Sequence, residues 1–135
     1  MDVFTGLAQG SAVGRRDFFL EILRRWCLAR RQTRPAQPPL VQMLSPSACE
    51  ILAPVFDALF LTFEACLGRP MAPGDEEVLT ADELDLVALL NGSQSSIFRF
   101  PQSRTEVILR VALRSTRIMV DLSRHPEGGG RPETQ

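Results

Sequence analysis

The sequence predicts an all-α protein, a small bundle of about four helices, and three observations support this fold class. Apolar residues recur at helical spacing over four segments of the 135-residue chain. Capping boxes precede several of these segments, and glycine or proline follows them. No segment alternates apolar and polar residues for long enough to predict a strand. With 44% apolar and 23% charged residues, the chain has the composition of a globular domain.

The first predicted helix begins near Arg15 and ends at the proline-rich segment 34–39. One helical stripe carries its apolar residues, namely Phe18, Phe19, Ile22, Leu23, Trp26 and Cys27. Leu28 is the apolar residue that falls on the opposite, charged face. Three prolines in 34–39 predict an extended linker, and residues 1–13, which lack a sustained period, predict a loose arm.

The second predicted helix begins near residues 45–47 and ends at Leu67 and Gly68. Pro54 is expected to kink this helix or to mark a later start. Its apolar face is the broadest so far and is expected to anchor the core, with Leu52, Val55, Phe56, Leu59, Phe60, Phe63 and Leu67. Leu61 falls among charged residues on the other side.

The third predicted helix is short. It follows the acidic loop 73–77, begins at a capping box formed by Thr80 and Glu83, and stops at residues 91–92. Residues 97–101 then predict a short extended connector.

The last predicted helix starts at a capping box in 103–106 and continues to about Ser123. Its predicted apolar face comprises Ile108, Val111, Ala112, Ser115, Ile118, Met119 and Leu122. We expect Ile108, Val111 and Met119 to bury Phe56, Leu59, Phe60 and Phe63 of the second helix. Residues 14–123 are therefore predicted to form a single helical domain, followed by a disordered tail over 124–135.

Several kinds of chemistry are disfavoured by the residues present. All 15 basic residues are arginine, so Schiff-base, P-loop and lysine-base mechanisms are excluded. The single histidine, His125, lies in the predicted tail, where nothing orients it. The three cysteines, Cys27, Cys49 and Cys66, lack zinc-site spacing and are predicted to be buried, reduced thiols. We expect no cofactor and no metal.

The compartment is inferred from what the chain lacks. The N-terminus has no basic region followed by an apolar run, so no secretory signal is predicted. The longest apolar stretch, 51–67, contains Asp57 and Glu64 and is too short to span a membrane. We expect a cytoplasmic protein with no membrane partner.

Two lines of charge share a seven-residue spacing. Glu50, Asp57 and Glu64 form the acidic line, and Arg110, Arg117 and Arg124 form the basic one. They would either pair along the flanks of an apolar seam, within the chain or across an interface, or remain two solvated faces. A separate cluster, Arg24, Arg25 and Arg31, is the candidate for contacting an anion.

The functional prediction is a non-enzymatic, cytoplasmic regulatory or adaptor protein that binds another protein or itself. The predicted interaction surface is a helical face that contains Leu28 or Leu61, bordered by the two lines of charge. One alternative is nucleic-acid binding through the arginine-rich first helix, which is disfavoured because the arginines spread around the helix and the net charge is −1. Another is a small enzyme with an acidic site near Asp82 and Asp85.

Overall fold

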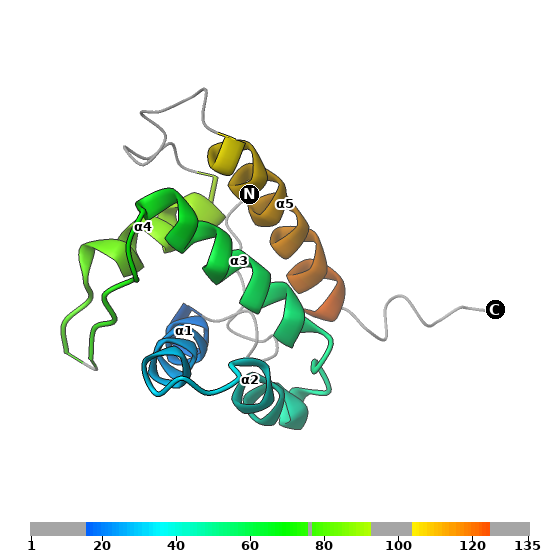
Figure 1. Cartoon of the computed structure of the whole chain (residues 1–135). Helices are drawn as coiled ribbons and strands as arrows, with labels where there is room; N and C mark the ends of the chain where they lie inside the picture. The colour runs from blue at the N-terminus through cyan, green and yellow to red at the C-terminus, as the bar shows by residue number, and fades with distance from the viewer. Residues whose placement is uncertain (1–15, 76, 93–103, 125–135) are drawn as a thin grey trace.

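A computed structural model describes residues 16–75, 77–92 and 104–124, whose regular structure is entirely helical (Figure 1). The elements are α1 (Arg16–Arg31), α2 (Gln37–Leu44), the 3-10 turn η2 (Ser45–Ser47), α3 (Leu52–Leu67), α4 (Ala81–Leu90) and α5 (Arg104–Arg124). The prediction of an all-α protein is confirmed. The predicted arm 1–13 and connector 97–101 lie outside the described residues, as does the tail predicted over 124–135 except for Arg124, which is the last residue of α5. None of the helices described is long and apolar enough to cross a membrane.

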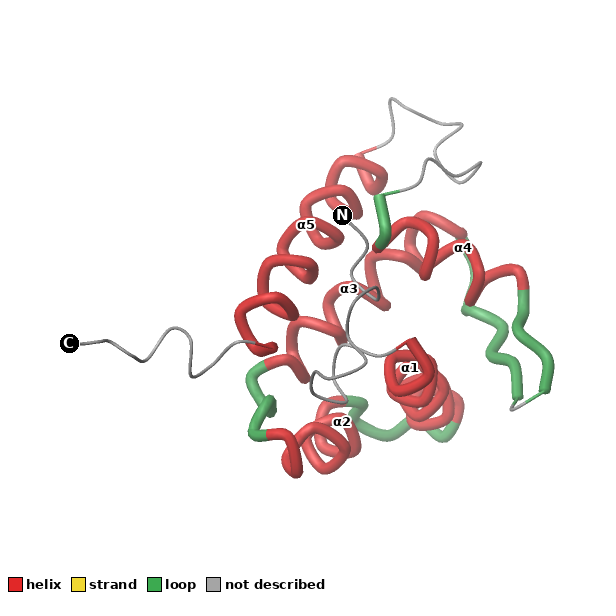
Figure 2. The backbone as a smooth tube through the Cα atoms, turned by 180° about the vertical axis from the view of Figure 1, so that it is seen from behind, coloured by secondary structure: helices red, strands yellow, loops and turns green. Residues whose placement is uncertain are grey.

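The helix α3 occupies the centre of the molecule. In both Figure 1 and Figure 2, α5 lies along one side of α3, whereas α1 and α2 lie on the other. The Cys66 side chain lies beside that of Thr105, and the Cys49 side chain beside that of Ser123, so the end of α3 is level with the start of α5. The two helices therefore run antiparallel.

The core is built around aromatic side chains from α1 and α3. The ring of Phe60 is fully buried, and its centroid lies 5.3 Å from that of Trp26 and 5.8 Å from that of Phe19. Phe56 stacks beside it at 6.0 Å. The apolar stripe predicted for the first helix and the core face predicted for the second are thus confirmed.

The proline-rich segment differs from its prediction. Residues 37–44 form α2 rather than a continuation of an extended linker, with Pro38 and Pro39 in its first turn. Proline is tolerated there because the first amides of a helix have no partner within the helix. Leu40 and Leu44 are fully buried, so packing against the core holds this short helix in place.

The start of α3 also differs from its prediction. Residues 45–47 form the 3-10 turn η2, which ends at Ala48 in the left-handed conformation, with φ of 57°. The helix begins at Leu52, so Pro54 lies in its first turn. Of the two options predicted for Pro54, a kink or a later start of the helix, the later start is therefore the one found. The predicted end is confirmed, because Gly68 has φ of 74° and its amide donates to the carbonyl of Glu64.

The α4 start matches its prediction in detail. The amide of Glu83 donates to the Thr80 hydroxyl at 3.2 Å, and the amide of Thr80 donates to the Glu83 carboxylate at 3.1 Å. This is the reciprocal capping box.

The largest correction concerns which side of α5 is buried. Ile108 is 49% exposed and Val111 61% exposed, so the prediction that these residues bury the phenylalanines of α3 was wrong. The buried side comprises Glu106, Leu109, Leu113, Thr116 and Val120. The arginines misled the prediction, because Arg117 does not mark the solvent face. Its guanidinium donates to the carbonyls of Leu89 and Leu90, at 3.0 and 3.2 Å, at the C-terminus of α4.

Candidate protein-interaction surface

The outward sides of α3 and α5 together form one apolar surface, here called the α3–α5 face. On α5 it comprises Val107, Ile108, Val111, Ser115, Ile118 and Leu122, and on α3 it comprises Pro54, Ala58, Leu61 and Ala65. All of these residues are exposed. The six largest apolar side chains, Leu61, Val107, Ile108, Val111, Ile118 and Leu122, are between 41% and 62% exposed.

Helical geometry explains why these residues share a side. On α3, Pro54, Ala58, Leu61 and Ala65 follow one another at spacings of four, three and four residues. On α5, Val111, Ile118 and Leu122 follow the same rule at spacings of seven and four. Such spacings keep residues on one face of a helix. Because α5 already buries Leu109, Leu113 and Val120 on its inner side, it is apolar on two opposite sides.

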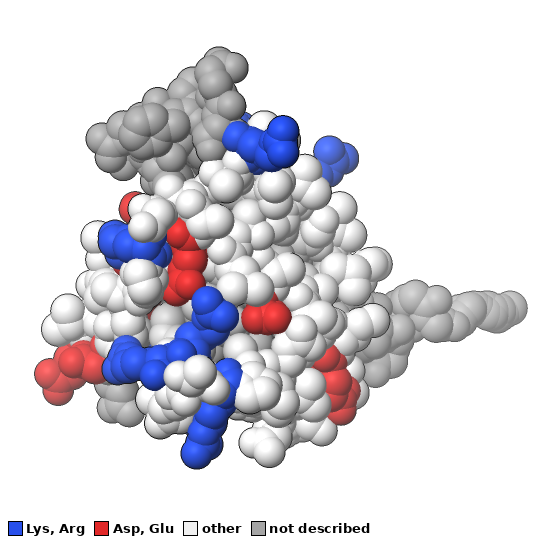
Figure 3. Space-filling view, viewed as in Figure 1, with Lys and Arg blue, Asp and Glu red and all other residues white. Residues whose placement is uncertain are grey.

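The α3–α5 face is large for a surface that none of the described residues covers. At 1.5 Å per residue, its α5 part is about 22 Å long and its α3 part about 16 Å long. Figure 3 shows that most of the surface over α3 and α5 is uncharged, with charged side chains mainly around it. A contiguous apolar patch with a polar border is typical of a protein-binding surface.

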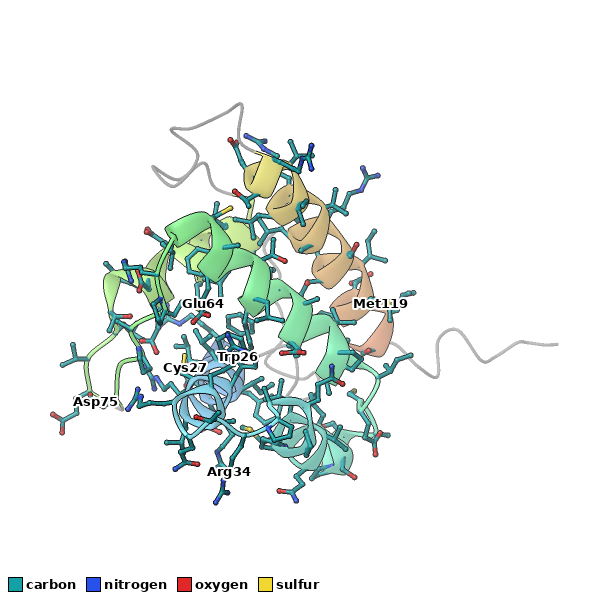
Figure 4. The ribbon with its side chains drawn as sticks, viewed as in Figure 1. Trp26, Cys27, Arg34, Glu64, Asp75 and Met119 are labelled. Atoms are coloured by element: carbon teal, nitrogen blue, oxygen red, sulfur yellow. The ribbon has the colours of Figure 1, made fainter. Side chains whose placement is uncertain are left out.

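Carboxylates lie along the side of α3 that faces α1, here called the acidic edge and consisting of Asp57 and Glu64. Asp57 accepts hydrogen bonds from the Trp26 indole at 2.7 Å and from the Gln37 amide at 3.1 Å. Glu64 accepts from the amide of Met71 at 2.8 Å and lies 3.8 Å from Arg30. Figure 4 shows Glu64 and Met119 on opposite sides of α3.

Arginines lie along the side of α5 that faces away from α3, here called the basic edge and consisting of Arg110 and Arg114. Arg110 pairs with Glu106 at 2.6 Å, and Arg114 is exposed. The two predicted lines of charge therefore lie on opposite edges of the α3–α5 face. The contacts given above join these charges to groups other than the opposite line, which holds for Asp57, Glu64, Arg110 and Arg117. Glu50 is exposed in the turn before α3, and the side chain of Arg124 is not among the side chains that the structure describes.

The two predicted interaction leucines occupy different surfaces. Leu61, 41% exposed, belongs to the α3–α5 face. Leu28, 43% exposed, lies on α1 and lines a hollow with Arg25 and with Pro35, Pro38 and Pro39 near α2. Leu28 therefore does not extend the α3–α5 face.

The candidate anion-contacting arginines do not act as one group. Arg24 makes a bidentate ion pair with Glu83, through Nε at 2.8 Å and Nη2 at 3.1 Å. Arg25 and Arg31 are exposed. In Figure 3, the arginines over α1 lie beside carboxylates of neighbouring elements. The cluster is therefore partly neutralised, which weakens the case for contact with a nucleic-acid backbone.

The candidate acidic site near Asp82 and Asp85 contains one carboxylate with a structural role. Asp82 accepts two hydrogen bonds from Arg69, at 2.7 and 2.8 Å, and one from the amide of Ala72 at 2.9 Å. The Arg69 guanidinium holds the pKa of Asp82 below its usual range. Burial, together with Asp82, raises the pKa of the half-buried Asp85. The described residues contain no group of three or more side chains placed to hold a metal.

The three cysteines are unbridged, as predicted. Cys27 and Cys49 are buried, and Cys66 is half-buried. The pKa of the Cys27 thiol is raised to about 12, mainly by burial and to a smaller extent by the nearby Glu64 carboxylate. Figure 4 shows Cys27 beside Trp26 and below Glu64. Its thiol stays protonated at neutral pH, which disfavours a nucleophilic role.

Comparison with protein-family models, with curated proteins and with solved structures gave no match. The sequence marked the α5 residues of the α3–α5 face as apolar but assigned them to the core. The signal that would have corrected this is the second apolar set on the same helix, Leu109, Leu113 and Val120.

Proposed function

We propose that this protein is a non-enzymatic regulatory or adaptor protein that binds another protein chain through the α3–α5 face. The observation that carries the proposal is the row of half-exposed branched side chains on α5, opposite a side that is already buried. A surface helix without a partner needs one apolar side, facing the core. A second apolar side that is exposed to water lowers the solubility of the protein unless another chain covers it.

The remaining features support an interaction protein rather than a catalyst. Asp82 and Glu83 are occupied by arginines and loop amides, and the free thiol of Cys27 is protonated. Unbridged cysteines are typical of a reducing compartment, so we propose that the protein acts in the cytoplasm.

Affinity capture from cells of the source organism tests the proposal. The bait is the purified chain, compared with Ile118→Asn on the α3–α5 face and with Leu84→Asn as a control. Leu84 is 50% exposed, as Ile118 is, but lies on α4. We expect the wild type and the control to retain the same bound protein, including further copies of this chain, and Ile118→Asn to lose at least 90% of it. Equal retention by all three baits would contradict the proposal.

A further inference from the structure

We infer that the chain covering the α3–α5 face is a second copy of this protein. The two copies are related by a twofold axis that runs parallel to α3 and α5, so that α5 of each copy lies on α3 of the other. This inference rests on the proposed function and names its partner. The contact would be two helices against two helices, as in a four-helix bundle.

Complementary charge on the two edges points to self-association. In a twofold interface the same surface is used by both copies, so that surface must complement itself. Rotation about an axis parallel to the helices brings the acidic edge of one copy against the basic edge of the other. Asp57 and Glu64 then lie beside Arg110 and Arg114 of the second copy.

The relative heights of these residues fit the pairing. Because Cys66 is level with Thr105 and Cys49 with Ser123, the middle of α3 is level with the middle of α5. Asp57 therefore lies level with Arg114, and Ala58 lies within about one helical turn of Ser115 in height. A rotation about an axis parallel to the helices leaves these heights unchanged. Asp121 is on the same side of α5 but two turns beyond Arg114, and Arg110 is paired with Glu106, so the positive charge that Asp57 would meet is that of Arg114.

Side-chain size favours the same arrangement. The α3 part of the face presents small residues, Pro54, Ala58 and Ala65 around Leu61, whereas the α5 part presents branched ones, among them Val111 and Ile118. Packing α5 on α3 of the other copy places large side chains over small ones, as ridges fill grooves.

The alternative twofold arrangement, with α5 on α5, is less favourable on both counts. The twofold axis of that arrangement would pass near the middle of the α5 part of the face, close to Arg114. The two Arg114 guanidinium groups would then lie on the same side of the interface, where like charges repel. Branched side chains would also meet branched side chains.

Disulfide trapping between two variants, each with one cysteine added to the three native ones, tests this arrangement. Ala58→Cys and Ser115→Cys are prepared separately, one with a mass tag, then mixed and oxidised with copper phenanthroline. Both positions are exposed, so each variant is expected to fold, which circular dichroism checks. Ala65→Cys mixed with Ile108→Cys provides a second pair at another height. The wild type, with its native cysteines, is the control.

The expected result is a covalent heterodimer of the two variants, at a yield at least fivefold above that of either variant alone or of the wild type. A covalent homodimer of Ser115→Cys alone, in excess of the heterodimer, would overturn the arrangement in favour of α5 on α5. Absence of any covalent dimer for both pairs would overturn the second copy as partner. The proposed function would still stand in that case if capture from cells yields a different protein that Ile118→Asn loses.

Discussion

Replacing Phe60 with alanine is expected to lower the free energy of unfolding by about 3 to 5 kcal/mol. Phe60 is fully buried, and its ring contacts those of Phe19, Trp26 and Phe56 from two helices. Truncation removes this burial and leaves a cavity, because the three surrounding rings cannot all move into the space. Urea or guanidinium denaturation followed by circular dichroism measures the loss.

Leu84→Ala is the matched control for this change. Leu84 is half-exposed on α4, so its truncation is expected to change the free energy of unfolding by less than about 0.5 kcal/mol. A loss below about 1 kcal/mol for Phe60→Ala would show that the aromatic cluster is not the main core of the protein.

Glu83→Gln is expected to cost about 2 to 3 kcal/mol. The Glu83 side chain is 1% exposed and accepts hydrogen bonds from Arg24 and from the amides of Gly74 and Thr80. The glutamine amide has the shape of the carboxylate but is neutral, so the ion pair with Arg24 is lost. Its NH2 group also faces the N–H donors that the carboxylate accepted from. The Arg24 side chain is 21% exposed, so water partly solvates it and holds the cost below that of breaking a fully buried pair.

The effect of Glu83→Gln is expected to depend on pH. Burial alone would raise the pKa of Glu83, but the hydrogen bonds from Arg24 and from the loop amides hold it below its ordinary value of 4.5. The carboxylate therefore stabilises the fold fully above pH 4.5, and this contribution is lost as the pH falls through the lower pKa of the folded state. Denaturation at pH 7 and at pH 3 should show a smaller difference between wild type and variant at pH 3. Glu77→Gln, in the exposed loop, is the control, and an equal loss in both variants would contradict the structural role of Glu83.

Local signals in the sequence predicted most helix ends well. The Thr80 and Glu83 capping box and the Gly68 stop are short-range patterns, and each is realised by hydrogen bonds within four residues. The short helix α2 was missed for the opposite reason. Prolines are equally compatible with an extended linker and with a first helical turn, and what decides here is the burial of Leu40 and Leu44 by distant residues.

The candidate surface was predicted in part. Leu61 was identified as an apolar side chain outside the core, and it is exposed. Ile108 and Val111 were assigned to the core, because a helical period shows that residues share a side but not which side is inside. The choice between the two apolar sides of α5 depends on tertiary contacts, such as Arg117 with the end of α4, that no local pattern contains.

Sedimentation equilibrium at concentrations from about 1 to 200 µM shows whether the α3–α5 face binds a second copy of the protein. Although the face is large for an uncovered surface, two helices on two helices make a short contact compared with a standard protein–protein interface, so we expect a reversible monomer–dimer equilibrium in the micromolar range. The same experiment on Ile118→Asn should give a monomer at every concentration, whereas Leu84→Asn should associate like the wild type. A wild-type protein that remains monomeric throughout, or an Ile118→Asn variant that dimerises as well as the wild type, would contradict the claim.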